Sequence, residues 1–277
     1  MRIVVCLKVV PRPEEVRVDL EKKVLERSGV RSVINPSDLN ALETALALRD
    51  RHGGRVTVLS MGPPSFEPYL RVALAVGADE AVLLSDRAFG GADTLATSYT
   101  LATGVGALGG ADLVVCGDES SDGGTSQVPQ GVAEWLGYSQ ATYVDRVEVS
   151  APGMLRARRV LEDGTETIEL PLPAVLSVLG GANEVRFIDY DRWAMAEQAT
   201  VRVIDAAALG GDPASIGLKG SPTVVAGLRE VRKPGRRREV LTLPPEAAAA
   251  RLAEELRRLG VTHPEGASAT RASPRSA

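Results

Sequence analysis

The sequence lacks the features of a secreted, membrane-spanning or nucleic-acid-binding protein. Only two cysteines occur among its 277 residues, and both lie in apolar runs, unlike the disulfide framework of a small secreted domain. No run of about eighteen apolar residues is present, so we expect no membrane-spanning helix. The formal net charge of -4 provides no general attraction to nucleic acid. A cytoplasmic protein with no nucleic-acid partner and no direct membrane insertion is therefore the first expectation.

Common catalytic and metal-binding patterns are also missing. There are only two histidines, and no Cys/His cluster with zinc-ligand spacing occurs. No nucleophile elbow and no Ser/His/Asp set can be assembled. What is present is an ordinary folded composition, with 44% hydrophobic and 25% charged residues. The N-terminal residues enter an apolar run directly, so we expect no signal peptide.

Short apolar runs alternate with helical patterns over the first 180 residues. Five runs are typical of strands buried on both faces: 3–7, 56–61, 81–84, 113–116 and 174–178. Helices are expected after Ser37, over 65–76, over 94–108 with Asp93 as its cap, and from about 126 to 136. This order predicts an α/β fold with a doubly wound, mostly parallel, Rossmann-like sheet.

The pattern changes twice in the second half of the chain. Three runs at 144–149, 155–161 and 165–170, separated by glycine-containing turns, predict a small antiparallel meander. After Gly180 the apolar pattern fades. We therefore expect a nucleotide-binding domain over 1–185, an arm with one helix over 186–263 that packs on another subunit, and a disordered tail over 264–277.

The most informative polar segment is 117–128, which follows a strand and precedes a helix. Its adjacent glycines allow positive φ and close approach of the backbone to a ligand. Thr125, Ser126 and the exposed amides can hold a phosphate, and Asp122 can accept from a ribose hydroxyl. The alternative is a polar surface loop with an N-cap. The glycine spacing matches neither of the two standard phosphate-binding motifs.

Three further segments fall where ligands bind in an open parallel sheet. Residues 85–98 contain Asp93, Thr94 and Thr97, whose alternative interpretation is a capped helix with solvated threonines. Residues 35–38 precede a helix, and Met61 follows a strand. Met61 and Cys6 are more often core residues than ligand contacts.

Taken in order, seven short motifs resemble the beta (small) subunit of electron transfer flavoprotein. They span residues 1 to about 186 and include 6–8 (Cys-Leu-Lys), 34–43, 60–63 and 73–79. The Asp122-x-x-Thr125-x-Gln127-Val128 loop, residues 158–175 with Pro173, and residues 183–186 complete the set.

This resemblance implies a beta subunit that forms a heterodimer with an alpha subunit, which carries an electron-transferring FAD. The beta subunit of such proteins holds either AMP or, in bifurcating members, a second FAD. The nucleotide contacts that the resemblance implies are Cys6 (backbone), Asn35, Pro36, Ser37, Asp38, Met61, Gly117, Asp122, Gly123, Gly124, Thr125, Ser126, Gln127 and Val128.

Residues 84–98 and 218–223 are similar to the FAD-binding, bifurcating type, so FAD is the expected cofactor, with AMP as the alternative. Asp93, Thr94 and Thr97 would meet the additional polar groups of FAD. Arg87 would lie near the isoalloxazine ring of this FAD and stabilise the anionic reduced form of the ring. The implied function is to position a flavin and shuttle electrons, with bifurcation, between a dehydrogenase and a downstream acceptor such as a quinone reductase.

Two departures from the family pattern are visible. Residues 120–122 read Ser-Ser-Asp where many relatives have Ala-Ile-Asp, and the partner-recognition stretch 187–200 lacks the usual lysine run. Two other classes share this architecture: an ATP-binding regulatory or stress module, and an adenylyl-transferring enzyme. The residues around Pro173 and the long C-terminal arm disfavour the first, and the absence of Ser-Gly-Gly-x-Asp-Ser disfavours the second.

Overall fold

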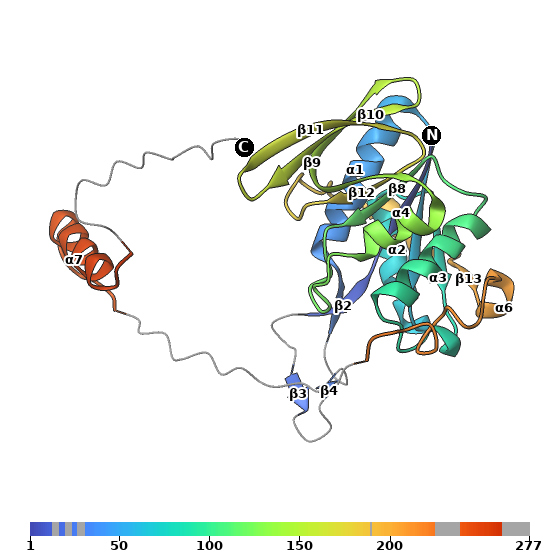
Figure 1. Cartoon of the computed structure of the whole chain (residues 1–277), viewed down its shortest axis with the longest axis horizontal. Coiled ribbons are helices and arrows are strands. Elements are labelled where there is room, and N and C mark those ends of the chain that lie inside the picture. Colours follow the sequence, from blue (N-terminus) through green and yellow to red (C-terminus); the bar gives the residue numbers. More distant parts are fainter. Residues whose placement is uncertain (13–16, 20–23, 27–30, 189, 225–238, 262–277) are drawn as a thin grey trace, which may run out of the picture. The chain divides into compact units, whose positions relative to one another are not determined.

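A nine-stranded sheet organises the chain in the computed structural model (Figure 1), in the order β11-β10-β9-β12-β8-β1-β6-β7-β13. The structure describes residues 1–12, 17–19, 24–26, 31–188, 190–224 and 239–261. The strands from β9 to β13 in that order pair in parallel, and β9, β10 and β11 form an antiparallel meander. The predicted fold class is confirmed.

The strands of this sheet are β1 (Arg2–Cys6), β6 (Arg55–Met61), β7 (Glu80–Leu84), β8 (Leu113–Gly117), β9 (Ser139–Ala151), β10 (Met154–Leu161), β11 (Gly164–Pro171), β12 (Ala174–Val178) and β13 (Arg202–Ile204). Two small hairpins were not predicted: β2 (Val9–Pro11) with β5 (Ser32–Ile34), and β3 (Arg17–Asp19) with β4 (Val24–Glu26). The helices are α1 (Pro36–His52), α2 (Glu67–Val76), α3 (Thr94–Ala107), α4 (Val128–Leu136), α5 (Tyr190–Gln198), α6 (Ala206–Leu209) and α7 (Pro245–Arg258), with single turns η2 (Pro64–Phe66) and η3 (Arg87–Phe89).

Helices cover both faces of the sheet because its parallel strands are apolar on both sides. In β1, Ile3 and Val5 pack in one core cluster with α1 and α2, whereas Val4 and Cys6 pack in a second cluster with α3 and α4. Successive side chains of a strand point to opposite faces, so a continuous apolar run serves two cores at once. This is why the strands were recognisable in the sequence.

The starts of α3 and α1 test two predicted helix caps, of which the first is present and the second is not. Asp93 caps α3, as predicted: its carboxylate accepts from the backbone N–H groups of Leu95 and Ala96. Ser37, expected to cap α1, lies inside that helix instead. Pro36 occupies the first helical position, where a missing N–H costs nothing and φ is already helical.

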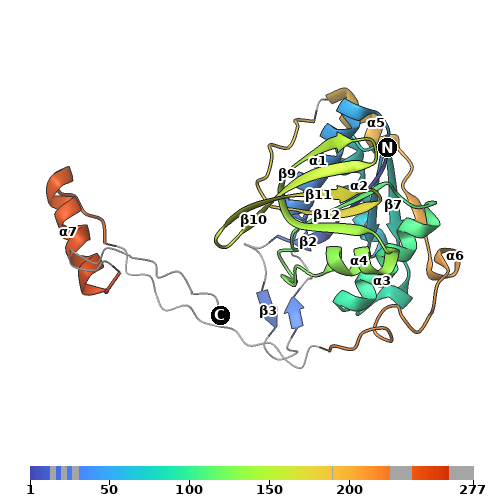
Figure 2. The same ribbon diagram turned by 45° about the horizontal axis from the view of Figure 1, so that its top comes forward.

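A sharp corner in β9 brings the meander beside α1 (Figure 2). The first part of β9 pairs in parallel with β12, and the part from Val144 onward pairs antiparallel with β10. Tyr143, between them, adopts a left-handed backbone with φ of 55°. Beyond this corner, Leu155 and Ala157 are fully buried in the same cluster as α1. The meander is thus part of the core.

The chain beyond residue 185 returns to the sheet. Arg186 donates to both carboxylate oxygens of Glu43 at 2.8 and 2.9 Å and forms an ion pair with Asp50 at 2.9 Å. Strand β13 then pairs with β7 at the edge of the sheet. Sequence reasoning missed this strand because it has only three residues, of which Ile204 alone is buried.

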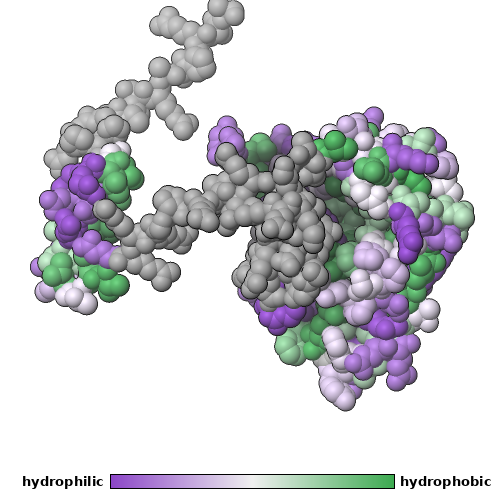
Figure 3. Space-filling model, turned by 90° about the horizontal axis from the view of Figure 1, so that it is seen from below, coloured by the Kyte–Doolittle hydropathy of each residue, from purple (hydrophilic) through white to green (hydrophobic). Residues whose placement is uncertain are grey.

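By internal contacts the chain divides into Met1–Arg229 and Glu230–Ala277. In the second unit, α7 has no buried residue, and Figure 3 shows hydrophobic as well as hydrophilic side chains on its surface. The three-part division expected from the sequence stays a prediction, and its tail, 264–277, lies outside the described residues. None of the helices within the described ranges has both the length and the apolar character needed to cross a bilayer.

If the meander belongs to the core, Leu155→Ala should lower the free energy of unfolding by about 2–5 kcal/mol, because it leaves a cavity at a fully buried position. Leu161, on the same hairpin but 41% exposed, is the matched control, and its replacement by Ala should change stability by less than about 0.5 kcal/mol. Urea unfolding followed by circular dichroism measures both. Equal effects at the two positions would contradict the packing of the meander.

Candidate functional site

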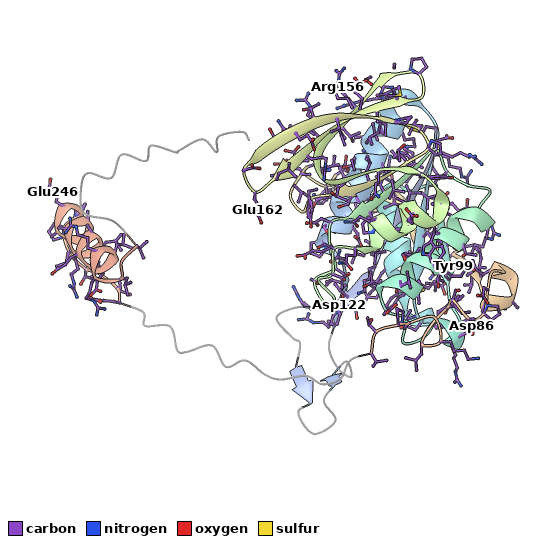
Figure 4. The ribbon with its side chains drawn as sticks, in the orientation of Figure 1. Asp86, Tyr99, Asp122, Arg156, Glu162 and Glu246 are labelled. Carbon is purple, nitrogen blue, oxygen red and sulfur yellow. The ribbon has the colours of Figure 1, made fainter. Side chains whose placement is uncertain are left out.

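The predicted polar segments lie together at one edge of the sheet, where the parallel strands have their carboxyl ends. Cys6 lies opposite Cys116, the residue before the end of β8, and Met61 lies opposite Leu84 at the ends of β6 and β7. The loops that follow these strands therefore start side by side. Figure 4 shows Asp122 and Asp86, from two of these loops, at the same end of the sheet.

Asp38 joins the ends of two central strands. One carboxylate oxygen accepts from the backbone N–H of Lys8 at 2.6 Å, and the other accepts from Gly117 N–H at 3.1 Å. A Cβ at position 117 would lie 2.4 Å from this carboxylate and from the Ser37 hydroxyl, so only glycine fits there. Burial raises the pKa of Asp38 to about 7, although the bonds from Lys8, Asn35 and Gly117 act to lower it.

Asn35 and Ser37 hold the main chain of the 118–127 loop. The Asn35 side-chain amide donates to the Glu119 carbonyl at 2.7 Å, and the Ser37 hydroxyl donates to the same carbonyl at 2.9 Å. The Asn35 side-chain oxygen accepts from Ser121 N–H at 3.1 Å. Both side chains are buried. The segment at residues 35–38 thus supports the loop from beneath.

Lys8 holds the loop through its side chain. Its ammonium donates to an Asp122 carboxylate oxygen at 2.5 Å and to the Ser120 hydroxyl at 3.1 Å. Burial alone would raise the pKa of Asp122, but the hydrogen bond and positive charge of Lys8, together with bonds from Ser120 and the backbone, lower that pKa. Asp122 is therefore held as a carboxylate.

The glycine-rich part of the loop is a tight turn. The N–H groups of Gly123 and Gly124 donate to the Ser120 carbonyl at 3.2 and 2.8 Å, and Gly124 has φ of 58°. Ser126 is also left-handed, with φ of 53°, and its hydroxyl donates to the Glu119 carboxylate at 3.2 Å. Gln127 is the residue before α4, which starts at Val128. Thr125 is exposed at the surface of this turn.

The start of α3 meets this loop. The Thr94 hydroxyl lies 3.3 Å from the Thr125 hydroxyl, within hydrogen-bonding distance. The two predicted polar segments are therefore adjacent, although 31 residues separate these threonines. Thr97, one turn further along α3, is half-buried, and Arg87 in η3 is exposed.

Asp93 has no free carboxylate oxygen. One oxygen caps α3, and the other accepts from the backbone N–H and the hydroxyl of Thr223 at 3.0 and 2.6 Å. Ser221 adds a bond to the Asp93 N–H at 2.8 Å. Asp93 thus fixes residues 221–223 against the helix start. Whether it also contacts a cofactor stays a prediction.

Cys6 and Cys116 are free, buried thiols on neighbouring strands. The hydrogen bond with Cys6 and burial together raise the pKa of Cys116 well above its usual value. Cys116 is therefore a neutral core residue at the base of the site, and Cys6 packs in the same core cluster. Sequence reasoning assigned no role to Lys8, Glu119 or Thr223. Lys8 lies in the motif at 6–8 directly after the first strand, and Thr223 lies in the stretch 218–223, but nothing in the spacing of either residue predicts its partner.

Comparisons with known proteins agree on one family. A model of the electron transfer flavoprotein domain matches residues 22–209. The chain is 47% identical over 259 residues to electron transfer flavoprotein subunit beta of Clostridium acetobutylicum, which covers 93% of this chain and 98% of the relative. It is 46% identical to Protein FixA of Azorhizobium caulinodans, over 88% of each chain. It is 42% identical to caffeyl-CoA reductase-Etf complex subunit CarD of Acetobacterium woodii, over 81% of this chain and 86% of the relative.

Asp38 should make stability depend on pH. Its pKa is about 7 in the folded chain and 3.8 in the unfolded chain, so the unfolded chain loses this proton first as pH rises. The stability that the protonated carboxyl contributes should therefore fall between about pH 4 and pH 7 and be constant above. We expect the difference in unfolding free energy between the wild type and Asp38→Asn to follow this course in urea titrations. A difference that stays constant between pH 4 and pH 7 would show that Asp38 is ionised in the folded chain over that whole range.

Proposed function

The chain belongs to the electron transfer flavoprotein family as a beta subunit, and from that premise we propose that its edge site binds FAD and that the protein relays electrons by bifurcation. Membership of the family implies an alpha subunit as partner. Bound FAD would supply the redox chemistry, accepting and releasing electrons. The residues of this chain would bind the nucleotide, orient the ring and contribute charge near it.

Asp122 and Thr125 are the proposed contacts to ribose and phosphate. The carboxylate of Asp122 is ionised and held by Lys8, which suits it to accept a ribose hydroxyl. The exposed Thr125 hydroxyl offers a donor to a phosphate, and the turn that holds it is closed by the bonds from the Gly123 and Gly124 N–H groups to Ser120. This donor set fits an adenosine 5′-phosphate, the part that AMP and FAD share.

The contact between Thr94 and Thr125 is the observation that carries the choice of FAD over AMP. It places the start of α3 beside the loop, so a ligand that extends beyond one phosphate meets a second group of donors. Thr94 and Thr97 supply hydroxyls there, and Arg87, exposed in the preceding turn, supplies a positive charge. Asp93 contributes by fixing the helix start, since both its oxygens already have partners.

Two surfaces fit the proposed partners. The alpha subunit is the proposed partner of the segment 186–263 apart from the region around α5, and within that segment Leu252 of α7 and Leu259, the residue that follows α7, are exposed. The second surface lies around α5, where the exposed fractions of Phe187, Tyr190 and Met195 are 94%, 83% and 75%. Exposed aromatic residues of this kind are enriched in protein interfaces. We assign this surface to the redox partner, a dehydrogenase or a quinone reductase.

The cofactor content of the alpha–beta heterodimer tests the choice of FAD. We expect two FAD per heterodimer when free FAD is present throughout purification, so that a weakly held flavin is not lost. Heat-released cofactors are quantified by chromatography with absorbance detection. One FAD plus one AMP per heterodimer would show that the beta site is of the AMP type.

The double substitution Asp122→Ala, Thr125→Ala should empty the beta site. Each lost charge-assisted contact should cost about 1.5–3 kcal/mol, or roughly ten- to a hundredfold in affinity. Ser121→Ala is the matched control, because Ser121 is exposed in the same loop and only its backbone N–H makes a recorded bond. The measurement is the nucleotide content of the heterodimer. Unchanged content in the double variant would place the nucleotide elsewhere.

A further inference from the structure

Lys8 joins two parts of the edge site, the start of α1 and the loop after β8. Its backbone N–H donates to Asp38 at 2.6 Å, and its backbone carbonyl accepts from Asn35 N–H at 2.9 Å. Its side chain crosses to the other side of the site and donates to Asp122 and Ser120. One residue after β1 thus connects the start of α1 to the loop after β8.

The loop that Lys8 reaches is acidic. Asp118, Glu119 and Asp122 lie within five residues of one another, and Asp38 is buried beneath them. Among the described residues, Lys8 is the cation with a recorded ion pair to this loop. The exposed fraction of the Asp122 side chain is only 13%, compared with 44% for Lys8. A carboxylate so enclosed needs a fixed partner, because an unpaired buried charge is costly.

The geometry points to Lys8 as the positioning residue that orients the Asp122 carboxylate for the ribose of the nucleotide. This inference rests on the proposed nucleotide site and gives a role to Lys8, which lies in the motif at 6–8 but is not among the nucleotide contacts that the resemblance implies. The ammonium binds one carboxylate oxygen at 2.5 Å, which anchors that oxygen and leaves the other oxygen to accept a ribose hydroxyl. The bond to Ser120 keeps the ammonium in place.

This role predicts a specific defect. Without Lys8, the Asp122 carboxylate loses its charged partner and keeps only the bonds from Ser120 and from its own backbone N–H, so the site loses its ability to distinguish ribose from deoxyribose. Adenine and phosphate contacts remain, so binding itself weakens less than discrimination does. Arginine retains the charge and can reach a carboxylate with two parallel donors, so it should preserve part of the discrimination.

The test uses the alpha–beta heterodimer, freed of nucleotide at the beta site, with AMP, 2′-deoxy-AMP and 3′-deoxy-AMP as probes in calorimetric titrations. We expect the wild type to prefer AMP over at least one deoxy analogue by about tenfold or more, as for loss of one charge-assisted bond. Lys8→Met should reduce this ratio to about one, and Lys8→Arg should retain a measurable preference. Arg202→Met, which removes an exposed positive charge at the start of β13, is the control and should leave the ratio unchanged.

The possible failures are distinguishable. A Lys8→Met heterodimer that binds all three probes more weakly but keeps the wild-type ratio would overturn the positioning role and leave the nucleotide site intact. A wild type that binds AMP without preferring it to either analogue would overturn the ribose contact of Asp122, and this inference with it. A wild type that does not bind AMP would overturn the proposed nucleotide site itself.

Discussion

The buried carboxylate of Asp38 is the interaction on which the rest of the site depends. Parallel strands end with backbone N–H groups that have no partner in the sheet, and the ends of β1 and β8 lie side by side. Asp38 accepts from both, at Lys8 and Gly117, and so fixes the points from which two loops depart. The positions of these two loops, and of the bond from Lys8 to Asp122, therefore depend on the two hydrogen bonds that Asp38 accepts.

The segment at residues 35–38 therefore works mainly as a support. Asn35 and Ser37 use their side chains on the main chain of the 118–127 loop, and Asp38 uses both oxygens on strand ends. Such supporting residues position a site by fixing its neighbours, and they need not touch the ligand to be essential. The same motif can thus mark a binding site in the sequence while contributing chiefly to its shape.

Local rules predicted what depends on neighbouring residues. The central strands were recognisable because they are apolar on both faces, and the cap of α3 because Asp93 immediately precedes it. The order of short motifs located the loop at 117–128 and, through the resemblance, the family. The partners of these residues were not predictable. Lys8 meets Asp122 across 114 residues and Thr223 meets Asp93 across 130, and no periodicity or spacing encodes such pairs.

The two carboxylate oxygens of Asp93 have different partners. One accepts from backbone N–H groups at the start of α3, and the other accepts from Thr223. A substitution at position 93 removes both, whereas a substitution at position 223 takes away both donors to one oxygen. We therefore expect selection to act on the two positions as a pair. Among relatives, positions 93 and 223 should vary together, so an alignment of their sequences would reveal that residues 221–223 are attached to the start of α3.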